Sequence, residues 1–416
     1  MNPQFKYLFR NRNFVKLWLS QILSQLTINI MTFYVLTQIY TVTQSTIAVS
    51  LIWIASALPA LIFGPFSGAL VDSFSRRKLL ILTNTAQAVV IFLALFISSS
   101  RVFSLYVIVF LYWLIDQLYL PSQQASVPAT VDRKFLASAN GLFLLTQQAS
   151  LLVGFGLGGI LLSILGSKLT IILASINLAV AAIATYYLPQ DLPPRRSTAE
   201  KNFLRFWQDF LVGYRFLKNH HLVLFPILMV ILTQIFSAII SIILPSYTHD
   251  VLRLDLNHAG IILIVPGALG ALAVTSSLPR LLKTKRKKDI MQAGLFSAGI
   301  SLLVMASLTW IPSLFIKVFL SLLVAIGVGA SFAAIAVPAQ TLIQQHTPPW
   351  FRGRVYAHMS FLLILATTLP LFIFATIADS LGVATMIAII GALLVGTYLY
   401  LRRHADLIII DAVNGA

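Results

Sequence analysis

Apolar residues occur along this chain in long runs separated by short polar segments. Each run is close to the roughly 20 residues that an α-helix needs to cross a hydrocarbon layer of about 30 Å. The pattern therefore predicts an all-α integral membrane fold of twelve transmembrane helices. The expected spans cover residues 14–39, 46–71, 79–99, 103–126, 136–163, 169–188, 222–248, 258–282, 290–309, 313–343, 355–378 and 381–401.

Composition supports a membrane protein. The 416 residues are 58% hydrophobic and 10% charged, which is far more apolar side chain than a soluble core of this size needs. The formal net charge is +17, but the basic residues stand in short clusters between apolar runs and form no continuous face. Membrane topology therefore explains them better than nucleic acid binding does.

The distribution of lysine and arginine indicates the orientation of the spans. Of the 29 basic residues, 25 lie on the side of the N-terminus if the spans alternate. Basic residues gather in cytoplasmic loops, so we expect both termini in the cytoplasm and the protein in the plasma membrane, typically a bacterial inner membrane. The first run follows Lys6, Arg10 and Arg12 and has no small-residue cleavage site, which indicates an uncleaved span and not a signal peptide.

A long polar break divides the chain into two halves. Within it, apolar residues of Phe203–Lys218 recur at helical spacing among basic ones, as in an interfacial helix that either rests on the membrane or reads lipids. Pro121 and Gln123 near the end of the fourth span are echoed by Pro338 and Gln340 near the end of the tenth. Repeated halves are a transporter plan. The expected domains are a first half at 1–188, a cytoplasmic linker at 189–221, a second half at 222–402 and a cytoplasmic tail at 403–416.

Several kinds of chemistry are excluded by what the sequence lacks. There is no cysteine, hence no disulfide framework and no thiolate metal site. No Gly-x-x-x-x-Gly-Lys-[Ser/Thr] stretch could cradle ATP, no His-Glu-x-x-His pair occurs, and one glutamate, Glu200, cannot build a carboxylate-rich site. The seven histidines show no ligand spacing. We expect no cofactor, no metal, no nucleic acid partner and no enzyme activity.

Asp116 is the acidic residue that stands well inside an expected span. An unpaired charge there is costly, so the carboxyl group must be neutral, hydrated or partnered. A proton-coupled transporter needs a group that is neutral in one state and charged in another. Asp116 is thus a candidate for proton coupling or substrate binding. The alternative is that its protonated carboxyl only hydrogen-bonds a neighbouring helix.

The loop after the second span carries the most recognisable pattern. Gly68, Asp72, Arg76 and Arg77 match the pattern Gly, three residues, Asp, a basic residue, any residue, Gly and two basic residues, with serines at the two other defined positions. The loop resembles the one between the second and third helices of the major facilitator superfamily of transporters. That resemblance implies a contact that gates the cytoplasmic mouth. A positive-inside cluster would explain the arginines, but not Gly68 or Asp72.

The first span carries a second pattern, which points to one branch of the superfamily. Gln21, Gln25 and Asn29 form a polar stripe on one helix face. The span is similar to that of drug:proton antiporters in the branch that includes macrolide and siderophore exporters, while Thr27 and Ile28 stand where Gly and Asp are usual. One proton-carrying candidate of that branch is therefore absent. The matching residues are Asn13-Phe14, Leu17-Trp18, Gln21 and Ser24-Gln25-Leu26.

Glycines in the fifth span, Gly154, Gly158 and Gly159, allow close helix packing. They resemble the glycine-rich fifth-helix motif of facilitator antiporters, with Phe155 in place of the usual proline. The motif favours export over import, and ordinary small-residue packing is the alternative. The arginine that many such antiporters carry in the fourth span is missing, because no basic residue lies between Arg101 and Arg133.

These features predict secondary active export of a small amphipathic or apolar molecule, of the drug, macrolide or siderophore type, by alternating access against protons. The partners are this substrate, the proton and the lipid bilayer, and the family resemblance implies a monomer. A lipid or lysolipid flippase on the same fold and a non-transporting membrane sensor remain open. The candidates for the cavity, lined by spans one, four, seven and ten, are Gln21, Gln25, Asn29, Trp53, Tyr112, Trp113, Gln117, Gln234 and Gln340.

Overall fold

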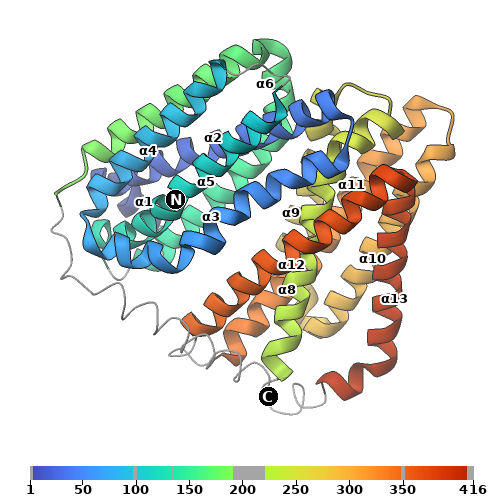
Figure 1. Ribbon diagram of the computed structural model, residues 1–416. Helices are drawn as coiled ribbons and strands as arrows, with labels where there is room; N and C mark the ends of the chain where they lie inside the picture. Colours follow the sequence, from blue (N-terminus) through green and yellow to red (C-terminus); the bar gives the residue numbers. More distant parts are fainter. Residues whose placement is uncertain (1–2, 97–100, 133–134, 191–220, 348–351, 410–416) are drawn as a thin grey trace. The chain divides into compact units, whose positions relative to one another are not determined.

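The computed structural model describes residues 3–96, 101–132, 135–190, 221–347 and 352–409, and they are almost entirely helical (Figure 1). The expected interfacial helix at Phe203–Lys218 lies outside these residues. The chain divides into two compact units: unit 1 is Met1–Thr43 with Leu51–Phe206, and unit 2 is Gln44–Ser50 with Trp207–Ala416. The proposed domain bounds stay a prediction, because the linker is not described.

The prediction of an all-α membrane fold is confirmed. Ten helices among the described residues are long and apolar enough to cross a membrane. One of them, α6 (Leu136–Tyr186), covers two of the expected spans. Gly166 lies between those two spans and has a non-helical backbone, with φ of 69° and ψ of 167°. In α12 (Arg352–Leu381) the described apolar stretch is Pro370–Leu381. The exact count of twelve spans stays a prediction.

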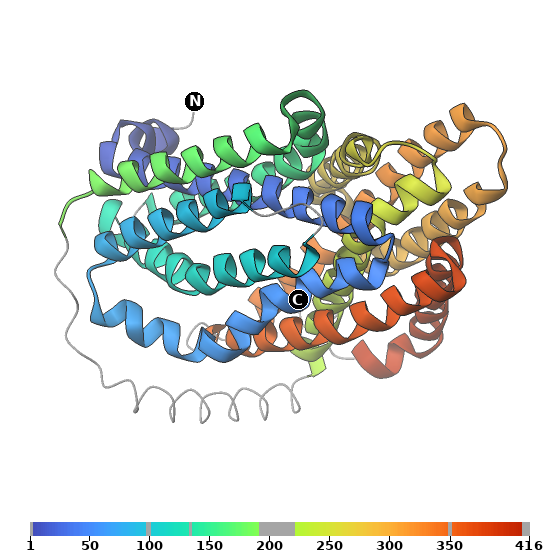
Figure 2. The same ribbon diagram turned by 45° about the horizontal axis from the view of Figure 1, so that its top comes forward.

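Unit 1 is organised around α6, which packs against α2 and α4. Both arms of α6 can be followed beside α2 and α4 (Figure 1, Figure 2), and α5 packs against α2 and α4. Pro121 and Pro128 lie within α5, where their missing N–H groups interrupt the helical ladder. The helices are α1 (Pro3–Arg10), α2 (Arg12–Thr43), α3 (Thr46–Ser73), α4 (Arg76–Leu93), α5 (Val102–Thr130) and α6. The first residues of α3, 46–50, belong to unit 2.

The short helix α1 was not predicted from the sequence. Its Leu8 is fully buried in a cluster with Phe14, and its Tyr7 ring stacks on Phe135 with 4.0 Å between ring centroids. The Tyr7 hydroxyl donates a hydrogen bond to Asp132 Oδ2 at 2.9 Å, and this bond raises the pKa of the Tyr7 hydroxyl. Asn11, directly after α1, donates to the Thr130 carbonyl at 2.6 Å. The N-terminal segment is thus fixed to the end of α5.

Unit 2 is organised around α11. This helix packs against α8, α9 and α10, while α13 packs against α10 and α12. Glycines bring α9 and α11 together: a Cβ added at Gly329 would overlap the backbone of Gly267, so a larger residue there would push the helices apart. The helices are α8 (His221–Ser246), α9 (Val265–Thr284), α10 (Lys287–Ser307), α11 (Leu314–His346), α12 and α13 (Val383–Ile409).

Candidate functional site

Asp116 lies midway along α5, in unit 1, and its side chain is half-buried. Its Oδ1 accepts a hydrogen bond of 3.2 Å from Nε2 of Gln87, a fully buried residue of α4. Within the described residues Asp116 has no ion-pair partner. The carboxyl group therefore meets a neutral amide, which can stay in contact with it whether or not it carries a proton.

Polar side chains from three helices of unit 1 surround this pair. On α5, Tyr112, Asp116, Tyr119 and Gln123 share one face, since they are spaced by four, three and four residues. Gln123 Nε2 donates to the Tyr119 hydroxyl at 3.0 Å. Opposite this face stand two serines of α2 and two amides of α4. We call this set the polar seam: Ser20, Ser24, Asn84, Gln87, Tyr112, Asp116, Tyr119 and Gln123.

Several atoms of the polar seam have unused hydrogen-bonding capacity. Asn84 Nδ2 donates to the Leu80 carbonyl at 2.8 Å and to Ser20 Oγ at 3.4 Å, while its Oδ1 is buried without a partner among the described residues. Gln87 Oε1 is in the same situation. The Tyr112 hydroxyl lies near Ser24 but makes no hydrogen bond of ordinary geometry. Buried polar atoms of this kind are costly unless a ligand, water or proton uses them.

Sequence reasoning found Asp116 and Tyr112 but missed their neighbours on other helices. Asn84 and Gln87 stand three residues apart in a span without charged residues, which was a usable signal for one polar face. Ser20 and Ser24 lie four apart on α2 in the same way. What the sequence could not supply is the rotation of α2 and α4 that turns these faces toward α5.

Two of the three residues of the polar stripe expected on the first span, Gln21 and Asn29, donate hydrogen bonds within unit 1, while Gln21 Oε1 is buried without a partner among the described residues. Gln21 is buried and its Nε2 donates to the Phe143 carbonyl of α6 at 2.9 Å. Asn29 Nδ2 donates to the Gln25 carbonyl at 2.7 Å. A Cβ added at Gly154 would overlap the Asn29 side chain, so α6 lies directly against α2 there.

The other glycines of that motif also lie at buried positions of α6. Gly158 faces the Phe33 ring of α2, since an added Cβ would come within 3.3 Å of it. Gly159 is buried. These contacts show where α2 and α6 approach each other. They do not test the expectation that the glycine motif favours export.

The remaining cavity candidates are divided between the units. Trp53 of α3 has a buried Nε1 without a partner among the described residues, and Gln117 Nε2 donates to the Trp113 carbonyl of its own helix at 3.3 Å. In unit 2, Gln234 of α8 is exposed and Gln340 of α11 is half-buried. A cavity shared by all of these residues stays a prediction.

The first two residues of α4, Arg76 and Arg77, donate to backbone carbonyls of other helices of unit 1. Arg76 Nη1 donates to the Ala125 carbonyl of α5 at 3.0 Å. Arg77 Nη2 donates to the Tyr186 carbonyl at 2.6 Å, and its guanidinium lies over the Tyr186 ring, 5.1 Å from the centroid. Tyr186 is the last residue of α6, and carbonyls at a helix C-terminus carry partial negative charge, which cations stabilise. Gly68 and Asp72 belong to the last turns of α3, and their surroundings lie outside the described part of the structure.

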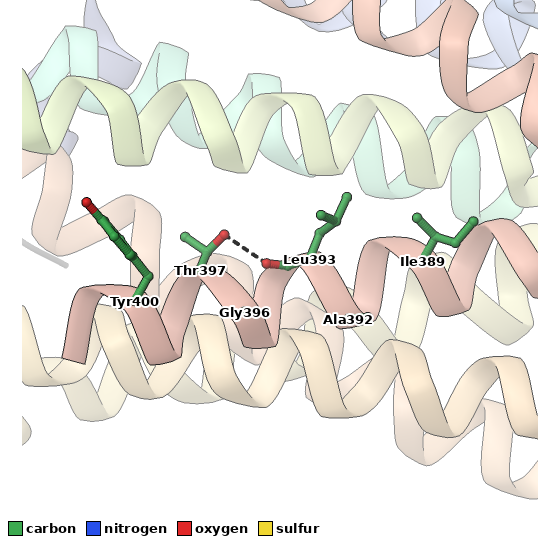
Figure 3. Close-up of a pocket in the computed structure, with 6 residues that line it drawn as sticks. All are labelled: Ile389, Ala392, Leu393, Gly396, Thr397 and Tyr400. Atoms are coloured by element: carbon green, nitrogen blue, oxygen red, sulfur yellow. Dashed lines mark hydrogen bonds between the residues drawn. The ribbon is translucent and has the colours of Figure 1, made fainter. Parts of the chain in front are cut away.

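A shallow pocket on α13 is lined by none of the candidate site residues (Figure 3). All six of its lining residues come from one helix, and none is charged. Its Thr397 hydroxyl donates to the Leu393 carbonyl of the same helix at 2.8 Å, as Figure 3 shows. Leu393 and Tyr400 are exposed, which suits a surface that faces lipid chains. The residues are Ile389, Ala392, Leu393, Gly396, Thr397 and Tyr400.

The sequence model of the Major Facilitator Superfamily matches residues 17–362. The chain belongs to this superfamily. It is a multi-pass membrane transporter and not an enzyme.

Among its relatives, the uncharacterised major facilitator transporter YfiS of Bacillus subtilis is 24% identical over 94% of this chain and 93% of its own length. Macrolide efflux protein A of Streptococcus pyogenes is 24% identical over 92% of this chain and 93% of its own. The multidrug efflux pump Tap of Mycolicibacterium fortuitum is 25% identical over 83% and 84%. Two of these three relatives are thus efflux proteins.

Solved structures agree with the fold. A POT family transporter in complex with a thioalcohol-conjugated peptide has a TM-score of 0.71 at 12% identity, covering 94% of this chain and 96% of its own. A bacterial homologue of the human lysosomal transporter Spinster has a TM-score of 0.69 at 14% identity, covering 99% and 97%. At these identities the likeness concerns the fold alone.

Proposed function

We propose that the protein exports a small amphipathic or apolar molecule of the drug, macrolide or siderophore type by alternating access, in exchange for protons. The observation that carries this proposal is Asp116: a half-buried carboxyl group in the middle of α5, hydrogen-bonded to neutral Gln87 and without an ion-pair partner among the described residues. Such a group can bind and release a proton, because no neighbouring positive charge holds it in the ionised state.

The distribution of charged residues and the names of two relatives together support the proposed substrate class. Sequence positions 17–75 and 79–100 hold a single charged residue, Asp72, so these spans offer no cation for an anionic substrate. The polar seam offers amide and hydroxyl groups to a molecule that is apolar elsewhere. Macrolide efflux protein A and Tap support drug-like substrates by their names.

The orientation and the site are parts of the same proposal. Both termini face the cytoplasm of a bacterial cell, as the lysine and arginine distribution predicts. Gln21, Gln25, Asn29, Trp53, Tyr112, Trp113, Gln117, Gln234 and Gln340 line the substrate pathway, and Gly68, Asp72, Arg76 and Arg77 form the cytoplasmic gate. The protein works as a monomer in the inner membrane.

Uptake into inverted membrane vesicles tests the function. The probes are ethidium, erythromycin, a catecholate siderophore and a fluorescent lysophospholipid, each with an imposed inside-acid pH gradient. Vesicles from cells that carry the empty vector are the control. We expect accumulation of at least one of the first three probes, abolished when a protonophore collapses the gradient.

Two results would contradict the proposal. Movement of the lysophospholipid alone would identify a lipid flippase on the same fold. No movement of any probe, with the protein present at normal amount in the vesicles, would favour the non-transporting sensor.

A further inference from the structure

Gln87 is the residue that donates a hydrogen bond to Asp116, and it is not among the site residues predicted from the sequence. Its Nε2 donates to Asp116 Oδ1 at 3.2 Å, and its own Oε1 is buried with no partner among the described residues. A primary amide offers two donors on one side and an acceptor on the other. The Nε2 group of Gln87 therefore makes a hydrogen bond, while its Oε1 is free to accept one.

The two protonation states of a carboxyl group need opposite partners. An ionised carboxylate only accepts hydrogen bonds, whereas a protonated carboxyl also donates one. We propose that Gln87 is a positioning residue for Asp116 in both states: Nε2 donates to the carboxylate, and after rotation of the amide Oε1 accepts the proton-bearing O–H. This inference rests on the proposed role of Asp116 in proton coupling.

The surroundings hold Gln87 in place without competing for its amide. Asn84, one turn earlier on α4, is fixed to the Leu80 carbonyl and to Ser20 of α2. Ser175 of α6 donates to the carbonyl of Ala88, the residue after Gln87, at 2.9 Å. These bonds tie α4 to α2 and α6, so the free motion left to Gln87 is rotation of its side chain.

Few other groups near Asp116 can titrate. On α5 the titratable neighbours are Tyr112 and Tyr119. α2 contributes the neutral Ser20 and Ser24, and α4 contributes the neutral Asn84 and Gln87. In α6 the single basic residue is Lys168, beyond the turn at Gly166, and that helix holds no acid. Asp116 is therefore the carboxyl group to which we assign a pH dependence of this part of unit 1.

Infrared difference spectroscopy of the purified full-length protein in lipid nanodiscs tests this inference without transport. The carbonyl stretch of a protonated carboxyl group is followed from acid to alkaline pH, and the Asp116 band is assigned as the one missing in Asp116→Asn. Gln87→Met removes the donor and the acceptor at nearly constant volume. We expect half-protonation to move about one pH unit upward, a tenfold change, because the charge-assisted bond to the carboxylate that is lost is stronger than the bond to the protonated form that is lost with it.

Two further variants sharpen the test. Gln87→Glu should also move half-protonation upward, because two neighbouring carboxyl groups cannot both ionise easily, and it provides the answer if Gln87→Met does not fold. Thr83→Val is the matched control: Thr83 is buried on the same helix, its hydroxyl bonds only the Leu79 and Leu80 carbonyls of that helix, and the variant should titrate as the wild type does. If a probe is transported, the pH profile of its transport should move together with the band.

The inference is overturned if Gln87→Met and Gln87→Glu titrate as the wild type does, or if Thr83→Val shifts the band as much as they do. It is also overturned if the wild-type Asp116 band does not titrate. Failure of every transport probe would instead count against the proposed function, while the spectroscopic result on Gln87 would still stand.

Discussion

The carboxylate of Asp379 accepts a hydrogen bond of 2.6 Å from the backbone N–H of Thr46, the first residue of α3. It also accepts from the N–H of Ile47 at 3.0 Å and from the Ser45 hydroxyl. All four residues belong to unit 2. A helix leaves its first N–H groups without partners and carries partial positive charge at that end, so this distant side chain serves as the cap of α3.

Asp379→Ala should therefore destabilise the start of α3. Loss of a capping side chain costs about 1 kcal/mol, and thermal unfolding in detergent should show a lowered midpoint. Ser380→Ala is the control, because the Ser380 hydroxyl bonds only within its own helix, to the carbonyls of Thr376 and Ile377. Equal midpoints for Asp379→Ala and the wild type would show that the cap contributes nothing.

Arg77→Lys tests whether Arg77, at the start of α4, acts through its positive charge alone or also through its planar guanidinium group. The variant keeps the positive charge that sets topology, but it loses the planar group that lies over the Tyr186 ring while bonding the Tyr186 carbonyl. We expect normal insertion and a loss of about 1 kcal/mol of stability. Lys78→Gln, at an exposed neighbouring position, should be close to neutral. If Arg77→Lys unfolds as the wild type does, the arginine acts through charge alone.

The contact between Tyr7 and Asp132 should depend on pH in the alkaline range. The folded state raises the pKa of Tyr7 above its ordinary value of 10.0, so the bond stabilises the docked α1 fully below pH 10 and is lost as pH rises through the folded pKa. Tyr7→Phe should abolish this alkaline dependence. Limited proteolysis of the N-terminal segment between pH 7 and pH 11 measures it, and a wild-type profile without an alkaline change would contradict the prediction.

The sequence predicted most of the fold because the length of an apolar run determines where a membrane helix begins and ends. The expected break between 163 and 169 contains Gly166, which takes the positive φ that other residues avoid. The helix α1 was missed, since a short basic segment before the first span carries no comparable signal. Its docking depends on Tyr7 and Leu8 meeting partners more than a hundred residues away.

The candidate site was predicted only in part. Asp116 was evident because an acid within an apolar run is costly. Gln87 was not, because an amide in a membrane span most often joins helices, and its contact with Asp116 requires the relative rotation of α4 and α5. The stripe of Gln21 and Asn29 was read as facing a cavity, while the structure shows both side chains bonded within unit 1. Their role in the substrate pathway stays a prediction.

The most direct measurement is proton-driven uptake by Asp116→Asn in inverted vesicles, beside counterflow of the same probe without a gradient. Asparagine keeps the shape and can still accept from Gln87, but it cannot exchange a proton. We predict that gradient-driven accumulation falls to the level of empty-vector vesicles while counterflow persists. Asp255→Asn, in an exposed loop, should behave as the wild type does. Gradient-driven accumulation by Asp116→Asn equal to that of the wild type would contradict the account.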